Sequence, residues 1–369
     1  MQTEAAVLWE TGPDWCIEPI ELDPPQAGEV LVGLRAIGLC HSDEHVRTGD
    51  LRASLPQICG HEGAGVVEEV GAGVTRIKPG DHVVFSFVPA CGVCPSCAQG
   101  HSNLCDLGAV LLAGTQLDWT SRHHARGQDL FTMCCLGTFA RHTVVQQASL
   151  VVIDPSIDLT RACLVGCGVT TGYGSAVYAA QVSPGENVAV IGCGGIGSAA
   201  IQGARLAGAE RIFAVDPIAW KLERARGFGA THVAEGIDEA RSVIEEATWG
   251  RMCDKVICAM GVGRGELMAP ILRLAAKRGR VVVTNLHAMA ESTISVNMTQ
   301  LTLFEKQIVG SLFGSANPHY DIPKLLELER EGQIDLAGMI TTTYPFEDLN
   351  RGYEDLRAGK NIRGVVTLA

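Results

Sequence analysis

The most concentrated chemical feature of the sequence is a set of four cysteines close together in the chain. The segment CGVCPSCAQGHSNLC contains Cys91, Cys94, Cys97 and Cys105, in the spacing C-x2-C-x2-C-x7-C. Four thiolates complete a tetrahedral zinc shell and leave no position open to a substrate. An Fe–S cluster or a redox disulfide would be an alternative use of the same residues. We predict a structural zinc lobe over residues 90–106 that takes no part in catalysis.

Catalysis by zinc requires a shell with an open position, so other soft ligands must come from elsewhere in the chain. Three separated motifs offer them: Cys40 in LCHSDEH, His61 in CGHEGAG and Cys167 in VGCGVTTGYG. Two cysteines and one histidine would leave the fourth position for water or substrate. Because cysteine is most often a small buried residue, the spacing alone also allows a purely structural role for these cysteines.

A glycine-rich motif indicates a dinucleotide site. The apolar run NVAVI is followed by GCGGIG and then by a segment with helical periodicity. In this G-x-G-x-x-G spacing the first glycine permits a tight turn and the second lets the backbone approach a pyrophosphate. The third lets the helix pack closely on the strand. The residues of the predicted site are Gly192, Gly194, Gly195, Ile196 and Gly197. A glycine turn without a ligand is the alternative.

The residue that ends the next apolar run bears on which dinucleotide binds. Asp216 closes RIFAVD, where a carboxylate accepts hydrogen bonds from a ribose diol and repels a 2′-phosphate. This favours NAD over NADP. Lys221, further along the next helical segment, could reach the same ribose. Asp216 as a loop cap and Lys221 as a solvated helix residue are the alternatives.

Composition excludes several classes of partner. The chain has 369 residues, with 41 acidic and 29 Lys or Arg residues and a formal net charge of −12. Nucleic acids and anionic membranes select basic surfaces, so we expect neither as a partner. We see no secretory leader and no apolar run of about 18 residues, which leads us to expect a cytoplasmic protein. There the 14 cysteines should be thiols or metal ligands.

The elements that must position these residues fall into two patterns. Short β segments between Gly and Pro residues occupy the first ~165 positions, among them EVLVGLRAIG, GVVEEVG, PGDHVVF and ARHTVVQ. From about residue 185, apolar strands alternate with helical segments, including one over 266–277, which predicts βαβ units on a parallel sheet. After about residue 312 we expect two helices and a final strand, RGVVTLA.

Taken together, these motifs resemble those of the zinc-dependent medium-chain alcohol dehydrogenases over essentially the whole chain. The matching stretches are GLCHSDEHVRTGD, CGHEGAGVVEEVGAGV, KPGDHVV, the four-cysteine lobe, ACLVGCGVTTGYGSA, GCGGIG and GKNIRG. Within that family the chain is most similar to the bacterial nicotinoprotein, or nitrosodimethylaniline-dependent, alcohol dehydrogenases. That similarity lies in HHARGQDLFTMCCLGTF, FGSANPHYDIPKLLEL and GYEDLRAGKNIRGV.

The resemblance implies an α/β architecture with two domains. A GroES-like β-barrel catalytic domain, residues 1–168 and 313–369, would be split in sequence around a Rossmann domain. The Rossmann domain, a doubly wound parallel sheet that binds NAD, would cover residues 169–312. Homodimers or homotetramers are expected from the resemblance only.

The resemblance also assigns roles to individual residues. Cys40, His61 and Cys167 would hold a catalytic zinc ion, and Cys91, Cys94, Cys97 and Cys105 a structural one. Asp43 would hydrogen-bond the far nitrogen of His61, and Glu62 would lie behind the metal. His41 and Arg363 would contact the coenzyme pyrophosphate. Relatives often have arginine at the position of His41, and histidine is a weaker, pH-dependent partner for an anion.

The implied reaction interconverts small alcohols and aldehydes with two zinc ions and NAD(H) as cofactors. Zinc would stabilise the alkoxide of the alcohol, which would then expel hydride to the nicotinamide. Ser42 would pass the proton through the nicotinamide ribose to His45 at the surface. From the residues alone, Ser42 as a helix N-cap and His45 as an ordinary surface histidine are the simpler interpretations.

Three apolar residues stand where the family lines its alcohol pocket: Phe87, Leu51 and Val110. They imply an aromatic or medium aliphatic alcohol, although apolar residues at such positions are usually core. We expect residues 113–136, a segment rich in polar residues, to form a loop at the pocket mouth. Its notable residues are Trp119, Arg122, His123, His124, Arg126 and Cys134.

Other functions remain open at this point. NAD(H) could stay permanently bound and be regenerated by an external acceptor. The chain could be a formaldehyde dehydrogenase acting on a thiol adduct, in which case activity would require an added small thiol. It could also be a zinc- and nucleotide-binding protein without catalysis, which would need no open zinc position.

Overall fold

The computed structural model describes residues 1–289 and 291–368, which form two compact units. The first unit contains Met1–Cys167, Asn317–Gly332 and the residues from Leu336 onward. The second contains Gly168–Ala316 and Gln333–Asp335. The expected fold class, a GroES-like barrel together with a Rossmann sheet, is confirmed by the two sheet topologies.

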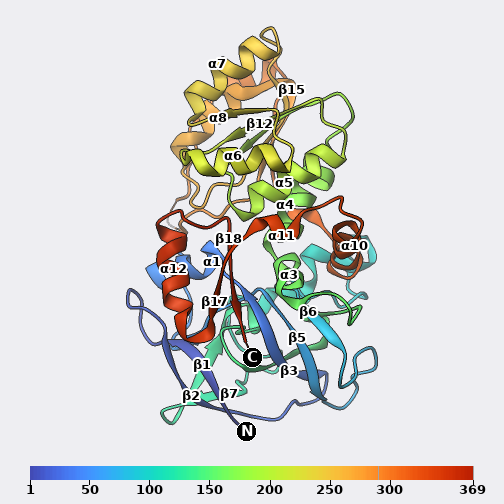
Figure 1. The fold of residues 1–369 in the computed structure, drawn as a ribbon, viewed down its shortest axis with the longest axis vertical. Coiled ribbons are helices and arrows are strands. Elements are labelled where there is room, and N and C mark those ends of the chain that lie inside the picture. The colour runs from blue at the N-terminus through green and yellow to red at the C-terminus, as the bar shows by residue number, and fades with distance from the viewer. Residues whose placement is uncertain (290, 369) are drawn as a thin grey trace. The chain divides into compact units, whose positions relative to one another are not determined.

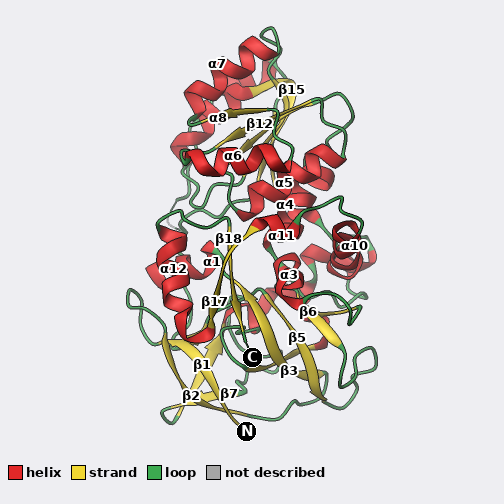
Figure 2. Ribbon diagram, in the orientation of Figure 1, coloured by secondary structure: helices red, strands yellow, loops and turns green. Residues whose placement is uncertain are grey.

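Five strands of the first unit close into a small barrel in the order β1-β2-β7-β8-β4. These strands are β1 (Gln2–Leu8), β2 (Cys16–Leu22), β4 (Gln57–Ile58), β7 (His123–Ala125) and β8 (Gln128–Thr132). Figure 2 shows β1, β2 and β7 side by side near the N-terminus. The β7–β8 hairpin lies within the segment that we expected to be a loop, and it closes the barrel between β2 and β4.

The first unit also contains a seven-stranded sheet built around β3 (Glu29–Gly38). Nine of the ten residues of β3 are buried, as expected for a strand that is covered on both faces. The other strands are β5 (Gly63–Val70), β6 (His82–Phe85), β9 (His142–Gln146), β10 (Leu150–Ile153), β17 (Ile340–Pro345) and β18 (Arg363–Thr367).

Short helices cover this sheet and connect its strands. They are α1 (His41–Thr48), α2 (Pro95–Ala98), α3 (Leu159–Ala162), α10 (Pro318–Arg330), α11 (Leu336–Met339) and α12 (Leu349–Arg357). Helix α12 packs beside β17 and β18, with α1 next to it (Figure 1). The C-terminal part of the chain therefore lies against the residues around position 40.

The second unit is a six-stranded parallel sheet in the order β13-β12-β11-β14-β15-β16. Its strands are β11 (Asn187–Ile191), β12 (Arg211–Val215), β13 (His232–Ala234), β14 (Cys253–Cys258), β15 (Ala275–Val283) and β16 (Gln307–Gly310). Its helices are α4 (Gly168–Gly174), α5 (Gly195–Leu206), α6 (Ala219–Phe228), α7 (Ile237–Ala247), α8 (Met268–Leu274) and α9 (Met298–Leu303).

The strand order of this sheet reverses between β11 and β14, which is the order of a doubly wound sheet. Helix α5 packs against α6, and α7 packs against α8 (Figure 1). Dinucleotides bind such doubly wound sheets at the carboxyl ends of the strands, where the order reverses. The glycine motif follows β11 at that position.

Two parts of the predicted secondary structure are wrong. The expected helix over 266–277 ends at Leu274, because the chain enters β15 at Ala275 and pairs there with β14. Strand β17 was not expected, because ITTTYP has no alternation of apolar and polar residues. It forms by pairing with β18, which is a tertiary contact.

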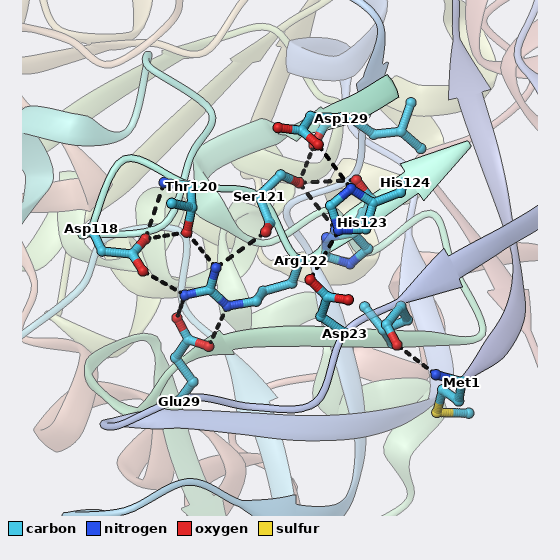
Figure 3. Close-up of polar contacts among 12 residues, drawn as sticks. Met1, Asp23, Glu29, Asp118, Thr120, Ser121, Arg122, His123, His124 and Asp129 are labelled. Atoms are coloured by element: carbon cyan, nitrogen blue, oxygen red, sulfur yellow. Dashed lines mark hydrogen bonds and ion pairs between the residues drawn. The ribbon is translucent and has the colours of Figure 1, made fainter. Parts of the chain in front are cut away.

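Segment 113–136 is held to the barrel by charged side chains, as Figure 3 shows. The guanidinium of Arg122, which is 2% exposed, donates two hydrogen bonds of 2.9 Å to the carboxylate of Glu29. It also contacts Asp118 at 2.7 Å. These contacts anchor the start of the β7–β8 hairpin to the first residue of β3.

His124, on β7, lies between two carboxylates (Figure 3). Its Nδ1 atom is 2.8 Å from Asp129 and its Nε2 atom is 3.0 Å from Asp23. Burial opposes the protonated form, but the two carboxylates raise the pKa of His124 above its usual value.

Within the described ranges, no helix is both long and apolar enough to cross a membrane.

Candidate metal and coenzyme sites

The first unit brings together the three residues that we predicted as catalytic metal ligands. The sulfur atoms of Cys40 and Cys167, a ring nitrogen of His61 and a carboxylate oxygen of Glu62 lie within 4.8 Å of one another. Cys40 precedes α1, His61 lies between β4 and β5, and Cys167 follows a short turn of 3-10 helix. All four residues are buried. The antiparallel pairing of β3 with β5 brings the chain at position 40 next to the chain at position 62.

The orientation of His61 fits a metal ligand. Its Nδ1 atom lies 3.2 Å from Oδ1 of Asp43, which also accepts a 2.8 Å hydrogen bond from the backbone N–H of Gly60. Its Nε2 atom is buried and has no hydrogen-bond partner among the described residues. A buried polar atom is normally satisfied. The donor set therefore fits a zinc ion bound through Nε2, with Asp43 fixing the ring.

The pKa values of the two cysteines of this cluster are shifted in opposite directions. The hydrogen bond between their thiols lowers the pKa of Cys40 well below its usual value and raises that of Cys167. A bound dication would replace the thiol protons and hold both sulfurs as thiolates. The pair is therefore prepared for a soft divalent metal such as zinc.

Glu62 is engaged by a neighbouring cation. Its carboxylate, which is fully buried, contacts the guanidinium of Arg363, which is 4% exposed. Burial opposes the charge on Arg363, but Glu62 and the two cysteines raise its pKa above the usual range. Glu62 is thus the one member of the four-residue group whose carboxylate is paired with a cation, and the position expected for it behind the metal remains a prediction.

The four-cysteine lobe forms a second, separate cluster. The sulfurs of Cys91, Cys94, Cys97 and Cys105 lie within 4.8 Å of one another. Backbone N–H groups of the loop point at these sulfurs, as in the 3.5 Å contacts from Cys97 and Asp106 to Cys94. The N–H groups of Asp106 and Cys97 lower the pKa of Cys94 to about 6. Burial raises the pKa of Cys97 and Cys105, so among these thiols the loop favours the thiolate of Cys94. The four converging sulfurs fit a closed structural zinc.

The residues of the predicted proton relay are placed differently from expectation. Helix α1 begins at His41 with Cys40 as its N-cap, so the alternative of Ser42 as N-cap is wrong. Ser42 Oγ lies 3.6 Å from the sulfur of Cys40, which places this hydroxyl beside the metal cluster. His41 is exposed at the start of the helix, and its contact with the pyrophosphate remains a prediction, as does that of Arg363.

His45 does not lie at the surface, as we had expected. It is 3% exposed, and its Nδ1 atom is 3.2 Å from Oδ2 of Asp50, whose side chain is 41% exposed. Residues 43–46 of α1 are all buried, and because they span more than a full turn, the protein covers this part of the helix on nearly every side. Asp50, which the sequence did not single out, carries the accessible end of this pair.

The predicted pocket residues lie at three places in the first unit. The ring of Phe87 meets that of His61 edge-on, with a centroid separation of 5.9 Å. The backbone N–H of Leu51 donates to His45, and its side chain packs against the barrel core. Val110 accepts a hydrogen bond from Cys135 at 3.5 Å. Phe87 is thus directly beside a predicted metal ligand, whereas the pocket roles of Leu51 and Val110 remain predictions.

In the second unit the three glycines of the motif have the environments that coenzyme binding requires. Gly192 has φ 96°, and a Cβ on it would lie 2.6 Å from the carbonyl oxygen of Ala259. A Cβ on Gly197 would lie 1.7 Å from the carbonyl oxygen of Gly192. Gly194 faces open space, and a Cβ on it would meet no atom within 4 Å. The first and third glycines are therefore needed for packing, and the second leaves room for a phosphate.

Asp216 is positioned by backbone N–H groups on both sides. Its Oδ2 atom accepts from Cys193 of the glycine motif at 2.8 Å, and Oδ1 accepts from Ile218 at 2.9 Å. It therefore does cap its loop, yet each oxygen retains a lone pair for a ribose hydroxyl. Lys221 is 8% exposed, so the alternative of a solvated helix lysine is wrong.

One residue of the metal environment was missed by the sequence analysis. The hydroxyl of Tyr353, on α12, donates to Oδ2 of Asp43 at 3.0 Å. The only sequence signal is the stretch GYEDLRAGKNIRGV, which contributed to the family resemblance without indicating a role for this tyrosine. The contact joins residues 310 positions apart and becomes visible only in the folded chain.

Two family models match the chain. Residues 26–155 match the alcohol dehydrogenase GroES-like domain, and residues 195–330 match the zinc-binding dehydrogenase domain. Alcohol dehydrogenase B of Mycobacterium tuberculosis is 50% identical over 368 residues, which cover 99% of this chain and 98% of that protein. The NDMA-dependent alcohol dehydrogenase of Amycolatopsis methanolica is 48% identical, with 99% of both chains covered.

Among solved structures, benzyl alcohol dehydrogenase from Acinetobacter calcoaceticus matches with a TM-score of 0.92 and 27% identity, covering both chains completely. The fold, the two matched domains and the two candidate metal clusters together define a medium-chain dehydrogenase that uses zinc and a nicotinamide coenzyme. The chain belongs to the zinc-binding alcohol dehydrogenase family, and it is an enzyme that interconverts alcohols and aldehydes.

Proposed function

We propose that Cys40, His61 and Cys167 hold the catalytic zinc and that the chain oxidises apolar alcohols with NAD. The pairing of Glu62 with Arg363 is the observation that carries this proposal, because it leaves three ligands and an open fourth position. Zinc in such a shell acts as a Lewis acid that lowers the pKa of an alcohol hydroxyl. The four-cysteine site offers no such position and is structural.

The residues of α1 are suited to removing the proton of the alcohol. The hydroxyl of Ser42 lies beside the Cys40 sulfur, where it can accept and pass on a proton. His45 lies deeper in the helix and is bonded to Asp50, whose side chain reaches solvent. The pair of buried His45 and solvent-exposed Asp50 therefore replaces a surface histidine as the proposed exit for the proton.

The carboxylate of Asp216 supports NAD rather than NADP as the coenzyme. Both of its oxygens are held by backbone N–H groups next to the glycine motif, so the carboxylate cannot turn away from an incoming ribose. A 2′-phosphate there would meet a fixed negative charge. A coenzyme that stays bound is a second candidate, which the relative named NDMA-dependent alcohol dehydrogenase favours.

The pocket wall favours an apolar substrate. Phe87 presents its ring edge-on to His61, which places an aromatic surface next to the predicted metal. The solved neighbour from Acinetobacter calcoaceticus is named for benzyl alcohol, an apolar aromatic alcohol. We therefore propose aromatic or medium aliphatic alcohols as the substrate class, and their turnover relative to charged alcohols tests this.

We also propose a homo-oligomer in the cytoplasm. Strand β16 forms one edge of the parallel sheet, and the chain before it exposes large apolar side chains: Leu286, Met289, Ile294, Met298 and Leu303. Unpaired edge strands and exposed apolar groups favour association with another copy. All 14 cysteines are free, as expected in a reducing compartment. A monomeric mass in solution would contradict the oligomer.

The replacement Cys167→Ser tests the catalytic site. We expect it to abolish alcohol turnover and to lower the zinc content from two ions per chain toward one, because a hydroxyl is a poor zinc ligand at neutral pH. The matched control is Cys163→Ser, a buried thiol in the same turn that is bonded to the carbonyl of Thr160. Normal turnover by Cys167→Ser, or equal losses in both variants, would refute the assignment.

A further inference from the structure

The hydroxyl of Tyr353 connects the C-terminal helix α12 to the residues that support the metal cluster. It lies 3.0 Å from Oδ2 of Asp43 and 3.3 Å from the carbonyl oxygen of Cys40. Both Tyr353 and Asp43 are fully buried. The tyrosine therefore faces the carboxylate behind His61 and the backbone of Cys40 at the same time.

The chemistry of these partners determines the direction of the hydrogen bonds. A carboxylate and a carbonyl can only accept, so the phenolic O–H must donate to them. Tyr353 thus donates its single hydroxyl proton toward a fully buried anion, and the contact with Asp43 is the shorter of the two.

Asp43 has three donors, which together hold its carboxylate in one orientation. Oδ1 receives the N–H groups of Gly60 and His61, and Oδ2 receives the hydroxyl of Tyr353. Without Tyr353, Oδ2 would lose the one partner that the described structure assigns to it. A carboxylate that can rotate no longer fixes the ring of His61, and partners of this kind control both ligand orientation and metal affinity.

We propose that Tyr353 is a positioning residue for the catalytic metal, acting through Asp43 on His61 and through the backbone on Cys40. The inference rests on the proposed assignment of His61 and Cys40 as zinc ligands. Tyr353 is a third residue behind the metal, after the ligand His61 and the carboxylate of Asp43, and it comes from the last helix of the chain. Its predicted effect is slow release of the catalytic zinc.

The aromatic ring of Tyr353 has its own packing role, which a conservative replacement preserves. Its ring centroid lies 4.4 Å from that of Trp15 and 5.9 Å from that of Phe139. Phenylalanine keeps these contacts and removes only the hydroxyl. Tyr353→Phe therefore tests the hydrogen bond with little change to the core.

The experiment measures zinc release from the zinc-loaded enzyme to a coloured chelator, and it resolves the two sites. In Tyr353→Phe we expect the catalytic zinc to leave up to about 10 times faster, at the lower end of the 10- to 100-fold loss in affinity that follows removal of a ligand's direct partner, because Tyr353 acts one residue further from the metal. The four-cysteine zinc should leave at the wild-type rate. Cobalt substituted at the catalytic site should also show shifted absorption bands.

The matched control is Tyr344→Phe, which also removes a buried tyrosine hydroxyl. That hydroxyl is hydrogen-bonded to Asp355, which lies on α12 as Tyr353 does. The control variant should lose stability without changing the release of the catalytic zinc. Unchanged release in Tyr353→Phe, or equal acceleration at both zinc sites, would overturn the proposal. If Cys40 and His61 are not zinc ligands, wild-type enzyme, Cys40→Ser and His61→Ala will instead bind the same amount of zinc, so the two failures are distinguishable.

Discussion

At the scale of single residues, the catalytic cluster consists of buried charges that neutralise one another. Glu62 and Arg363 form an ion pair with almost no exposure to solvent, directly beside the thiols of Cys40 and Cys167. Such a pair adds little net stability compared with apolar residues, but loss of one partner leaves an uncompensated charge in the interior. The pair keeps a carboxylate close to the metal position without making it a permanent ligand.

Removing the cation should therefore destabilise the first unit strongly. We expect Arg363→Met to lower the free energy of unfolding by about 3 to 5 kcal/mol, because the carboxylate of Glu62 loses its partner. The double replacement Glu62→Gln with Arg363→Met removes both charges and should recover much of this loss. A double-mutant cycle compares the urea unfolding of wild type, Arg363→Met, Glu62→Gln and the double variant. Purely additive losses would show that the two side chains are not coupled.

At the scale of elements, catalytic residues lie where a strand or turn meets a helix. Cys40 caps α1 directly after β3, and the glycine motif joins β11 to α5. At both places a short connection between two regular elements positions the functional groups. Within the motif, however, the glycines serve two purposes that a substitution can separate.

Alanine at two positions of this turn should give opposite results. At Gly194 a methyl group meets no atom within 4 Å, so Gly194→Ala should fold with stability within about 0.5 kcal/mol of wild type and bind NAD weakly. At Gly197 the methyl group would overlap the carbonyl of Gly192, so Gly197→Ala should fail to fold or lose several degrees in melting temperature. Melting curves with and without NAD separate the two effects. Tight NAD binding by Gly194→Ala would contradict the phosphate site.

At the scale of the whole molecule, one chain combines a metal-binding unit with a coenzyme-binding unit. Each unit has its own core and its own sheet, and each contains the residues for one half of the chemistry. An enzyme of this kind can release its coenzyme after each turnover or keep it and exchange hydride between two substrates. The relatives include a protein named NDMA-dependent alcohol dehydrogenase as well as proteins named simply as alcohol dehydrogenases.

The amount of coenzyme retained by purified protein distinguishes these two modes. After dialysis and denaturation, close to one NAD(H) per chain would mean that the coenzyme stays bound. Alcohol oxidation would then depend on an added acceptor rather than on free NAD. Close to zero would mean that NAD is an ordinary co-substrate. The Gly194→Ala variant is the control, since it should carry no coenzyme in either case.

The sequence by itself determined the features that depend on neighbouring residues. The four cysteines of the structural zinc lie within one short loop, and the glycine motif lies between one strand and one helix, so their spacing carries the geometry. The catalytic ligands Cys40, His61 and Cys167 could be grouped only through the family resemblance, because three distant segments must meet to form the site. Their individual roles remain proposals.

Only the tertiary structure decided what surrounds these ligands. Three features could not be predicted from the sequence: the burial of His45, the pairing of Glu62 with Arg363, and the hydrogen bond from Tyr353 to Asp43. The last two join residues that are far apart in the sequence. The physical reason is that a buried charge or hydrogen-bonding group must find a partner inside the core. Which partner it finds depends on how β3, β5, β18 and α12 pack together, and no local pattern encodes that packing.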